Sequence, residues 1–192
     1  MRSETTAVRI TRAAQRIFER EGADAVSMRR VATAVGITPM AIYRHFSDRR
    51  ALLNAIADAG FADLAGQFNG AKGRSCADQI DSLMSAYLDF ALERPRLFEY
   101  MFSVRREGAR RFPKDFEAGK SPTANLLATL VRNAMDAGQL RQDDVWEVTM
   151  ALTAEAHGLI VLYMGGRFQL GEKEFRNLFR RSMRRLLHGV AK

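Results

Sequence analysis

Apolar residues recur at the spacing of an α-helix along almost the whole chain. In segment 7–21 they occupy positions i, i+3, i+4, i+7 and i+8, as Ile10, Ala13, Ala14, Ile17 and Phe18. A stripe of this kind predicts an amphipathic helix with one buried face. The alternation of apolar and polar residues that predicts a half-buried strand is missing throughout the sequence. We therefore predict an all-α fold of about nine helices, without an internal repeat.

Capping residues, prolines and glycines divide this pattern into separate helices. Gly22 and Gly36 are typical helix stops. Ser27 and Thr38 can cap two short helices, and Pro39 takes the first helical position of the second. Segments 69–75 and 105–120 have little periodicity and are expected to be loops. The expected helices cover about residues 7–21, 27–35, 39–46, 48–68, 76–94, 95–102, 121–137, 143–164 and 172–188.

Positive charge is concentrated at the two ends of the chain. The 192 residues carry a formal net charge of +8, and most of the basic residues are arginine. Residues 1–50 contain ten arginines against five acidic residues, and residues 171–192 contain seven basic against two acidic residues. Basic ends are typical of chains that bind a polyanion, although a solvated surface explains the charge about equally well.

No feature of the sequence points to a membrane or to an oxidising compartment. The longest uninterrupted apolar run, residues 158–166, has nine residues, against the roughly 20 that span a bilayer. The N-terminus lacks the apolar stretch of a signal peptide. Cys76 is the only cysteine, so it cannot form an internal disulfide. We expect a cytoplasmic protein that does not bind a membrane.

The most informative segment is 27–46, where two short helices are joined by a tight turn at Gly36. This layout is typical of a helix-turn-helix, whose second helix enters the major groove of DNA. Arg44 suits guanine, and Met40 and Ala41 suit thymine methyl groups. A plain helical hairpin with a solvated polar face is the alternative. The other residues expected at DNA, mainly at phosphates, are Ser27, Thr38, Pro39, Tyr43, His45 and Arg49.

The same region resembles the TetR family of bacterial transcriptional regulators. The resemblance runs from about Ile10 to Ala57 and is strongest in Val35-Gly36-Ile37-Thr38 and Ile42-Tyr43-Arg44-His45-Phe46. It implies that Arg29 reaches a base or a phosphate from the second helix. It also implies that Arg49 replaces the phosphate-binding lysine of many members. Residues 156–162 resemble the His-Gly helix of one C-terminal subfamily.

The resemblance also implies a division of the chain and a function. We expect a helix-turn-helix domain in residues 1–47, a connecting helix in 48–68, and an effector-binding and dimerisation domain in 69–192. The expected function is repression from an inverted-repeat operator, bound by a homodimer and relieved by a small hydrophobic effector. The dimer is expected to use helix 143–164 and the stripe Phe175, Leu178, Phe179 and Leu186.

Large apolar and aromatic side chains are candidates for the effector pocket. With few polar groups among them, they suit a flat or lipophilic molecule held by one or two hydrogen bonds. They could equally fill an ordinary core, and a lone histidine such as His157 is more often a core residue than a ligand. The candidates are Leu83, Met84, Tyr87, Phe98, Met101, Phe102, Trp146, Met150 and His157.

The sequence contains no recognisable catalytic motif and no set of metal ligands at the usual spacing. We therefore expect no enzyme activity, no metal and no cofactor. Two other functions stay open. One is DNA binding without sequence preference. The other is a membrane-surface or acidic-partner module that uses the basic face of the last helix.

Overall fold

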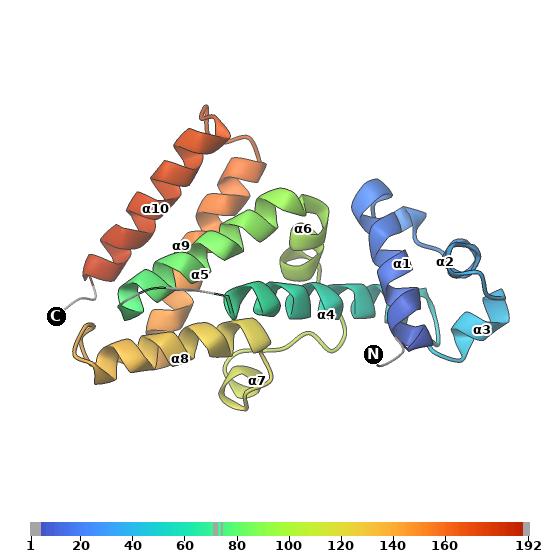
Figure 1. The fold of residues 1–192 in the computed structure, drawn as a ribbon, viewed down its shortest axis with the longest axis horizontal. Coiled ribbons are helices and arrows are strands. Elements are labelled where there is room, and N and C mark those ends of the chain that lie inside the picture. Colours follow the sequence, from blue (N-terminus) through green and yellow to red (C-terminus); the bar gives the residue numbers. More distant parts are fainter. Residues whose placement is uncertain (1–4, 71–72, 74, 190–192) are drawn as a thin grey trace. The chain divides into compact units, whose positions relative to one another are not determined.

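The computed structural model describes residues 5–70, 73 and 75–189. Within these ranges the chain forms ten α-helices and one 3₁₀ turn, η1, without a β-strand (Figure 1). The all-α prediction is confirmed, and the helix beyond the expected nine is α7, inside the predicted loop 105–120. The bounds are α1 Thr6–Glu21, η1 Ala23–Ala25, α2 Met28–Val35, α3 Pro39–Tyr43, α4 Arg49–Phe68, α5 Cys76–Glu93, α6 Pro95–Ser103, α7 Lys114–Glu117, α8 Pro122–Asp136, α9 Val145–Met164 and α10 Glu172–Gly189.

The helices form two compact units that interleave along the chain. The N-terminal unit comprises the described residues up to Asp63 together with 94–109. The C-terminal unit comprises the described residues of 64–93 and of 110–189. Helix α6 therefore packs within the N-terminal unit. The functional boundaries 1–47, 48–68 and 69–192 stay a prediction.

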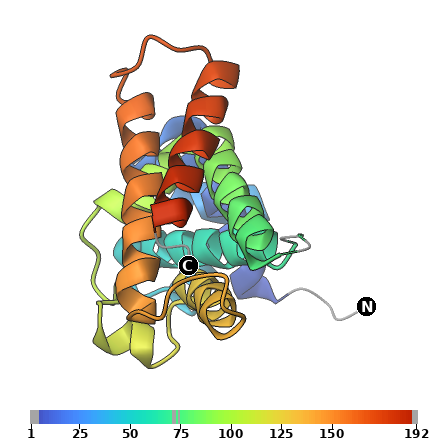
Figure 2. The same cartoon turned by 90° about the vertical axis from the view of Figure 1, so that its left-hand side faces the viewer.

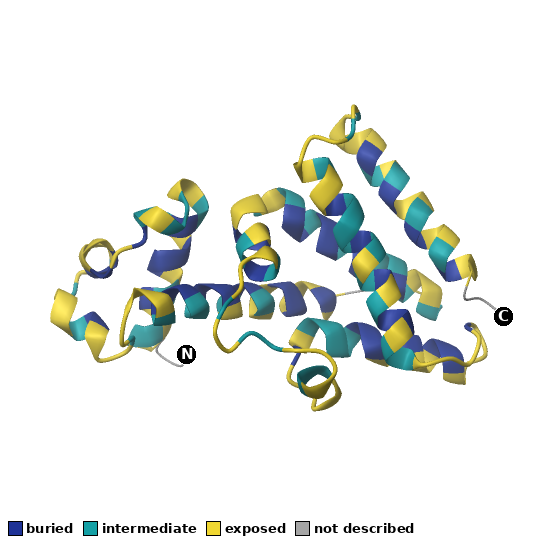
Figure 3. Cartoon of the chain, turned by 180° about the vertical axis from the view of Figure 1, so that it is seen from behind, coloured by how far each residue is buried: buried dark blue, intermediate teal, exposed yellow. Residues whose placement is uncertain are grey.

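The N-terminal unit has a core formed by the apolar faces of its helices (Figure 3). Helices α1, α2 and α3 begin after Thr5, Ser27 and Thr38, respectively. Each of these side chains accepts a hydrogen bond from a backbone N–H three residues later, which satisfies one of the amides left unpaired at a helix start. Fully buried side chains of this core include Ile10, Val26, Val31, Ile42, Leu52, Ile56 and Leu97.

The C-terminal unit is an aromatic-rich helical bundle. Helix α5 packs against α8, α9 and α10, and α9 and α10 lie side by side and antiparallel (Figure 2). Tyr163 of α9 stacks on Phe175 of α10 with ring centroids 4.0 Å apart. Fully buried side chains include Ile80, Phe90, Leu152, Ile160, Phe175 and Phe179.

The inward face of α10 corrects part of the sequence prediction. Phe175 and Phe179 are buried within their own chain, so they cannot supply the dimer contact expected of them. Leu178 and Leu186 are only half-buried, and Met183 is fully buried in their place. The core row follows a spacing of four, at residues 175, 179, 183 and 187, because side chains four apart lie on the same helix face.

Helix α9 corrects the expectation that no segment could cross a membrane. Its 20 residues are long and apolar enough to do so by length and composition alone. A search for uninterrupted apolar residues overlooks it, because Glu147 and Glu155 interrupt the apolar run within the helix. Core helices of soluble proteins pass the same test. Only 28% of the most apolar stretch of α9 is buried within this chain.

Candidate nucleic-acid interface

The turn between α2 and α3 is set by its glycine. Gly36 has a φ of +76°, in the left-handed region that glycine adopts without strain. The N–H of Ile37 then donates to the carbonyl of Ala32 at 3.0 Å, which closes the end of α2. Thr38 then caps the start of α3, with Pro39 at the first helical position. These local signals give the helix-turn-helix expected from sequence.

One face of α3 is buried and the other is open to solvent. Ile42 is fully buried and anchors the helix, whereas Met40 is 71% and Tyr43 50% exposed. Helix α3 ends at Tyr43 rather than at Phe46, and Arg44 is its C-terminal cap. The N–H of Phe46 donates to the carbonyl of Ile42 at 2.9 Å, so residues 44–46 continue as a turn. Thr38, Pro39, Arg44 and His45 are exposed, and Ala41 is half-buried.

Two neighbouring arginines at the start of α2 have different surroundings. Arg30 pairs with the carboxylate of Glu21, its Nη1 lying 2.8 Å from Oε2. The hydrogen bond from Arg30 holds the pKa of Glu21 below its ordinary value. Arg29 is exposed, next to the exposed cap Ser27. Arg30 therefore holds the end of α1, whereas Arg29 and Ser27 are open to a ligand.

The hydrogen bonds that Arg49 makes could not be predicted from the sequence. Its Nε donates to the carbonyl of Val26 at 2.7 Å, and its Nη2 donates to the carbonyl of Ala23 at 2.6 Å. The carboxylate of Asp24 lies 3.7 Å away. Arg49 thus ties the start of α4 to η1. No pattern in the sequence marks the two carbonyls, because their partner is 23 and 26 residues away.

A basic hollow beside α2 was also missed. Its volume is about 260 Å³, and the residues that line it are Arg9, Arg12, Arg16, Ala34 and Val35. The three arginines are exposed and lie on one face of α1, at positions i, i+3 and i+7. In the sequence they counted only toward the positive charge of residues 1–50, which a polyanion partner and a solvated surface explain about equally well.

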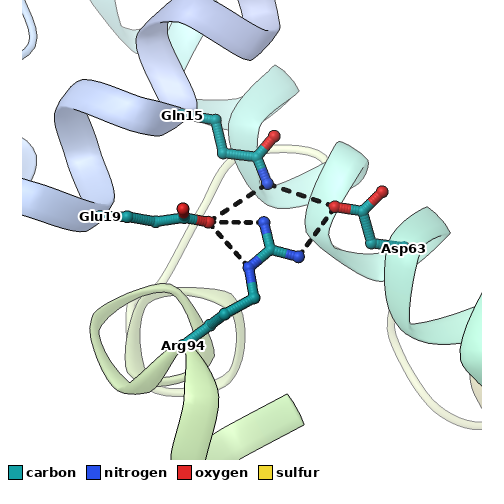
Figure 4. Close-up of polar contacts among 4 residues, drawn as sticks. All are labelled: Gln15, Glu19, Asp63 and Arg94. Carbon is teal, nitrogen blue, oxygen red and sulfur yellow. Dashed lines mark hydrogen bonds and ion pairs between the residues drawn. The ribbon is translucent and has the colours of Figure 1, made fainter.

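Arg94, just before α6, joins three elements of the N-terminal unit (Figure 4). Its Nε donates to Glu19 of α1 at 2.8 Å and its Nη1 donates to Asp63 of α4 at 2.9 Å. Gln15 donates to the same oxygen of Asp63 at 3.3 Å. Burial alone would lower the pKa of Arg94, but its hydrogen bonds to Asp63 and Glu19 raise it. The charged form of Arg94 therefore fixes α6 against α1 and α4.

The candidate effector residues fall into both units. Phe98, Met101 and Phe102 lie on α6 in the N-terminal unit, where Phe102 packs edge-on against Phe61 at 5.2 Å. Leu83, Met84 and Tyr87 are buried on α5 in the C-terminal unit. Half-buried Trp146 and Met150 lie on α9, as does His157.

Within the C-terminal unit the candidates belong to two different clusters. The ring of Trp146 packs with Phe112 and Phe116, at centroid distances of 6.4 and 6.1 Å. The hydroxyl of Tyr87 lies 3.0 Å from Nδ1 of His157. Burial lowers the pKa of His157 and raises the pKa of Tyr87, so a neutral pair is favoured near neutral pH. Among the described residues, no three His, Cys, Asp or Glu side chains group as metal ligands do.

Comparisons with known proteins agree with this geometry. A family model described as bacterial regulatory proteins, tetR family, matches residues 10–56, and one described as tetracyclin repressor-like, C-terminal domain, matches residues 80–186. The class A tetracycline repressor protein from transposon 1721 of Escherichia coli is 27% identical over 85% of this chain and 69% of its own. A protein of unknown function from Rhodococcus sp. RHA1 has a TM-score of 0.83 at 25% identity, over 100% of this chain and 98% of that chain. A TetR family transcription regulator from Marinobacter aquaeolei VT8 shares the fold, with a TM-score of 0.70 at 19% identity over 97% and 95% of the two chains.

The match to the C-terminal model alone covers more than half of the residues, so this chain belongs to the tetR family. It is a transcription regulator with a helix-turn-helix DNA-binding domain and a ligand-binding C-terminal domain.

Proposed function

We propose that the protein is a repressor that binds an inverted-repeat operator as a homodimer and leaves it when a small hydrophobic effector binds. The exposed face of α3, anchored by the fully buried Ile42, is the observation that carries the proposal. A short helix anchored on one side and open on the other can enter the major groove of DNA. The proposed place of action is the cytoplasm, where operator DNA is found, and no catalysis, metal or cofactor is needed.

The side chains around α3 divide into base and phosphate contacts by their chemistry. Arg44 suits the O6 and N7 acceptors of guanine, and Met40 and Ala41 suit thymine methyl groups. Ser27, Arg29, Thr38, Tyr43 and His45 suit phosphates and set the register of the helix on the duplex. Arg49 already donates to two carbonyls, so we assign it mainly to positioning α4 beside these residues.

The apolar surface of α9 supports the proposed dimer. Val161 is 45%, Leu162 47% and Met164 36% exposed, on a helix that is apolar along most of its length. An apolar face of this kind is typical of an oligomer interface. The half-buried Leu178 and Leu186 of α10 are candidates for the rim of the same interface, in place of Phe175 and Phe179.

The Tyr87–His157 pair is the proposed anchor of the effector. It is a polar contact between α9 and α5, and α5 also carries the buried apolar Leu83 and Met84. A ligand that carries one donor or acceptor on an apolar body could replace either partner. The same histidine starts the proposed His-Gly subfamily signature at residues 157–158.

The experiment that tests the proposal is selection from a library of random DNA duplexes with wild type and Arg44→Ala. We expect wild type to select a two-fold symmetric motif. Arg44→Ala should lose preference at one base pair per half-site, at about 1–3 kcal/mol for each lost guanine contact. The control is His45→Ala, which should weaken all sequences alike.

Three other results would contradict the proposal. If wild type selects no motif, the protein binds DNA without sequence preference. If the motif lacks two-fold symmetry, the dimer is wrong. If the protein floats with anionic vesicles more readily than it binds DNA, the basic face of α10 serves a membrane surface instead.

A further inference from the structure

The hollow lined by Arg9, Arg12 and Arg16 has no role in the function proposed above. It lies between α1 and the last turn of α2, which supplies Ala34 and Val35. Gly36 follows directly and leads into α3. The hollow is thus part of the N-terminal unit and adjoins the turn of the helix-turn-helix, but it lies outside the face of α3.

The charge in the hollow is all of one sign. None of the side chains that line it, all among the described residues, is acidic. Arginines three and four residues apart on one helix face repel each other, and a bound anion would offset that repulsion. Nη2 of Arg9 donates to the carbonyl of Val35 at 3.2 Å, which holds one guanidinium against α2.

The size and the chemistry of the hollow select a class of ligand. Its volume of about 260 Å³ is below the roughly 300–1,000 Å³ of pockets that hold drug-sized molecules. Guanidinium groups match the oxygens of a phosphate with paired hydrogen bonds. The side chains are exposed, so a phosphate attached to a larger molecule can reach them.

We propose that the hollow binds a backbone phosphate of the DNA that flanks the half-site read by α3. The inference rests on the proposed DNA-binding function and adds a contact outside α2, α3 and the start of α4. In a dimer each half-site would gain this contact, so the protein would hold more DNA than its base-reading helices touch. Free phosphate shares the chemistry, and the experiment must separate the two sources.

The experiment uses the symmetric duplex selected by wild type, prepared with and without additional base pairs beyond each half-site. Binding is measured over a range of KCl concentrations. We expect the flanked duplex to bind wild type more tightly and to steepen the salt slope by about 0.9 per added phosphate contact, or ~1.8 for a dimer. Arg16→Gln should lose this gain and bind the unflanked duplex as wild type does. Arg12→Gln should change in the same direction.

Arg20→Gln is the matched control, since it removes the same charge from the same helix at a residue outside the hollow. If Arg16→Gln and Arg20→Gln weaken binding equally, the effect is one of net charge and the proposal is wrong. Arg9 is left unchanged because of its hydrogen bond to α2. Thermal unfolding of each variant checks that α1 is still folded.

A second arm uses inorganic phosphate at constant ionic strength. If phosphate raises the melting temperature of wild type but not of Arg16→Gln, while flanking DNA adds nothing, the hollow binds a free anion and the proposal is overturned. If neither phosphate nor flanking DNA has an effect, the hollow binds no phosphate and the proposal is wrong. If wild type selects no sequence at all, the proposed function fails together with this inference. Selection of a motif without a flank effect overturns the inference alone.

Discussion

The surface around α2 and α3 in the N-terminal unit differs in character from the surface of α9 in the C-terminal unit, although α10 of the C-terminal unit is also basic. The N-terminal unit presents arginines, hydroxyls and a histidine around α2 and α3. The C-terminal unit presents Val161, Leu162 and Met164 on α9, a helix apolar enough to pass for a membrane span. Charged surface attracts a polyanion, whereas apolar surface is stabilised by burial against another apolar surface. The difference fits the two macromolecular partners proposed above, DNA for the first unit and a second copy of the chain for the other.

The contacts between helices also differ in emphasis, although both units contain ion pairs and aromatic contacts. Polar side chains such as Arg30, Arg49 and Arg94 tie together the helices of the N-terminal unit. In the C-terminal unit, the ring of Tyr163 on α9 stacks on that of Phe175 on α10. Substitutions in the two units should therefore change different measured properties of the protein.

A charge on the exposed apolar face of α9 should have the largest effect. Leu162→Glu would bury an unpaired carboxylate in the proposed dimer. We expect the dimer to weaken about 30- to 1,000-fold, or ~2–4 kcal/mol. Sedimentation over a range of concentrations measures this, and the far-ultraviolet circular dichroism should stay that of wild type. Asn133→Glu on the exposed side of α8 is the control for an added charge. A wild-type dimer constant in Leu162→Glu would mean that α9 is not the interface.

Two adjacent arginines of the N-terminal unit, Arg49 and Arg50, should differ in their effect on stability. Arg49→Ala removes two hydrogen bonds to the carbonyls of Ala23 and Val26, and we expect a loss of about 1–2 kcal/mol in the free energy of unfolding. Arg50→Ala removes only an exposed ion pair with Glu107, whose nitrogen and oxygen are 3.2 Å apart. That loss should stay below about 0.5 kcal/mol. Urea unfolding compares the two variants, and equal losses would show that the Arg49 contacts do not stabilise the unit.

Features set by residues close together in the chain, such as the exposed Arg44, could be predicted from the sequence, whereas the distant contacts of Arg49 could not. The helix starts at Ser27 and Thr38, the turn at Gly36 and the exposed face of α3 follow from residues close together in the chain. The partners of Arg49 lie more than 20 residues away, and the hollow needs α1 and α2 placed side by side. Tertiary contacts of this kind leave no local pattern.

The same limit applies to the cores. A repeat of four selects Met183 for the core of α10, although leucines at 178 and 186 are the more hydrophobic residues. Periodicity identifies a face of a helix to within one residue row, and packing against α5 and α9 decides which row is buried. The packing of α6 in the N-terminal unit uses the contacts of Arg94 and the buried side chains of Leu97 and Phe98, whose partners composition and spacing do not reveal.

The smallest expected effect is a pH dependence confined to the C-terminal unit. Burial lowers the pKa of His157 below its ordinary value, so the unfolded chain takes up a proton at a higher pH than the folded chain does. Between the two values the unfolded state binds more protons, and the free energy of unfolding rises with pH. The contribution is therefore complete above about pH 6.5 and is lost as the pH falls below that value. Since His157 is only half-buried, the slope should stay well below the limit of about 1.4 kcal/mol per pH unit for one proton.

Urea unfolding of wild type and His157→Gln across this range measures the difference, with His45→Gln as the exposed control. The profile should flatten in His157→Gln and keep its wild-type slope in His45→Gln. The opposite pattern would place the titrating group in the N-terminal unit and would contradict the role of the Tyr87–His157 pair as the proposed polar anchor.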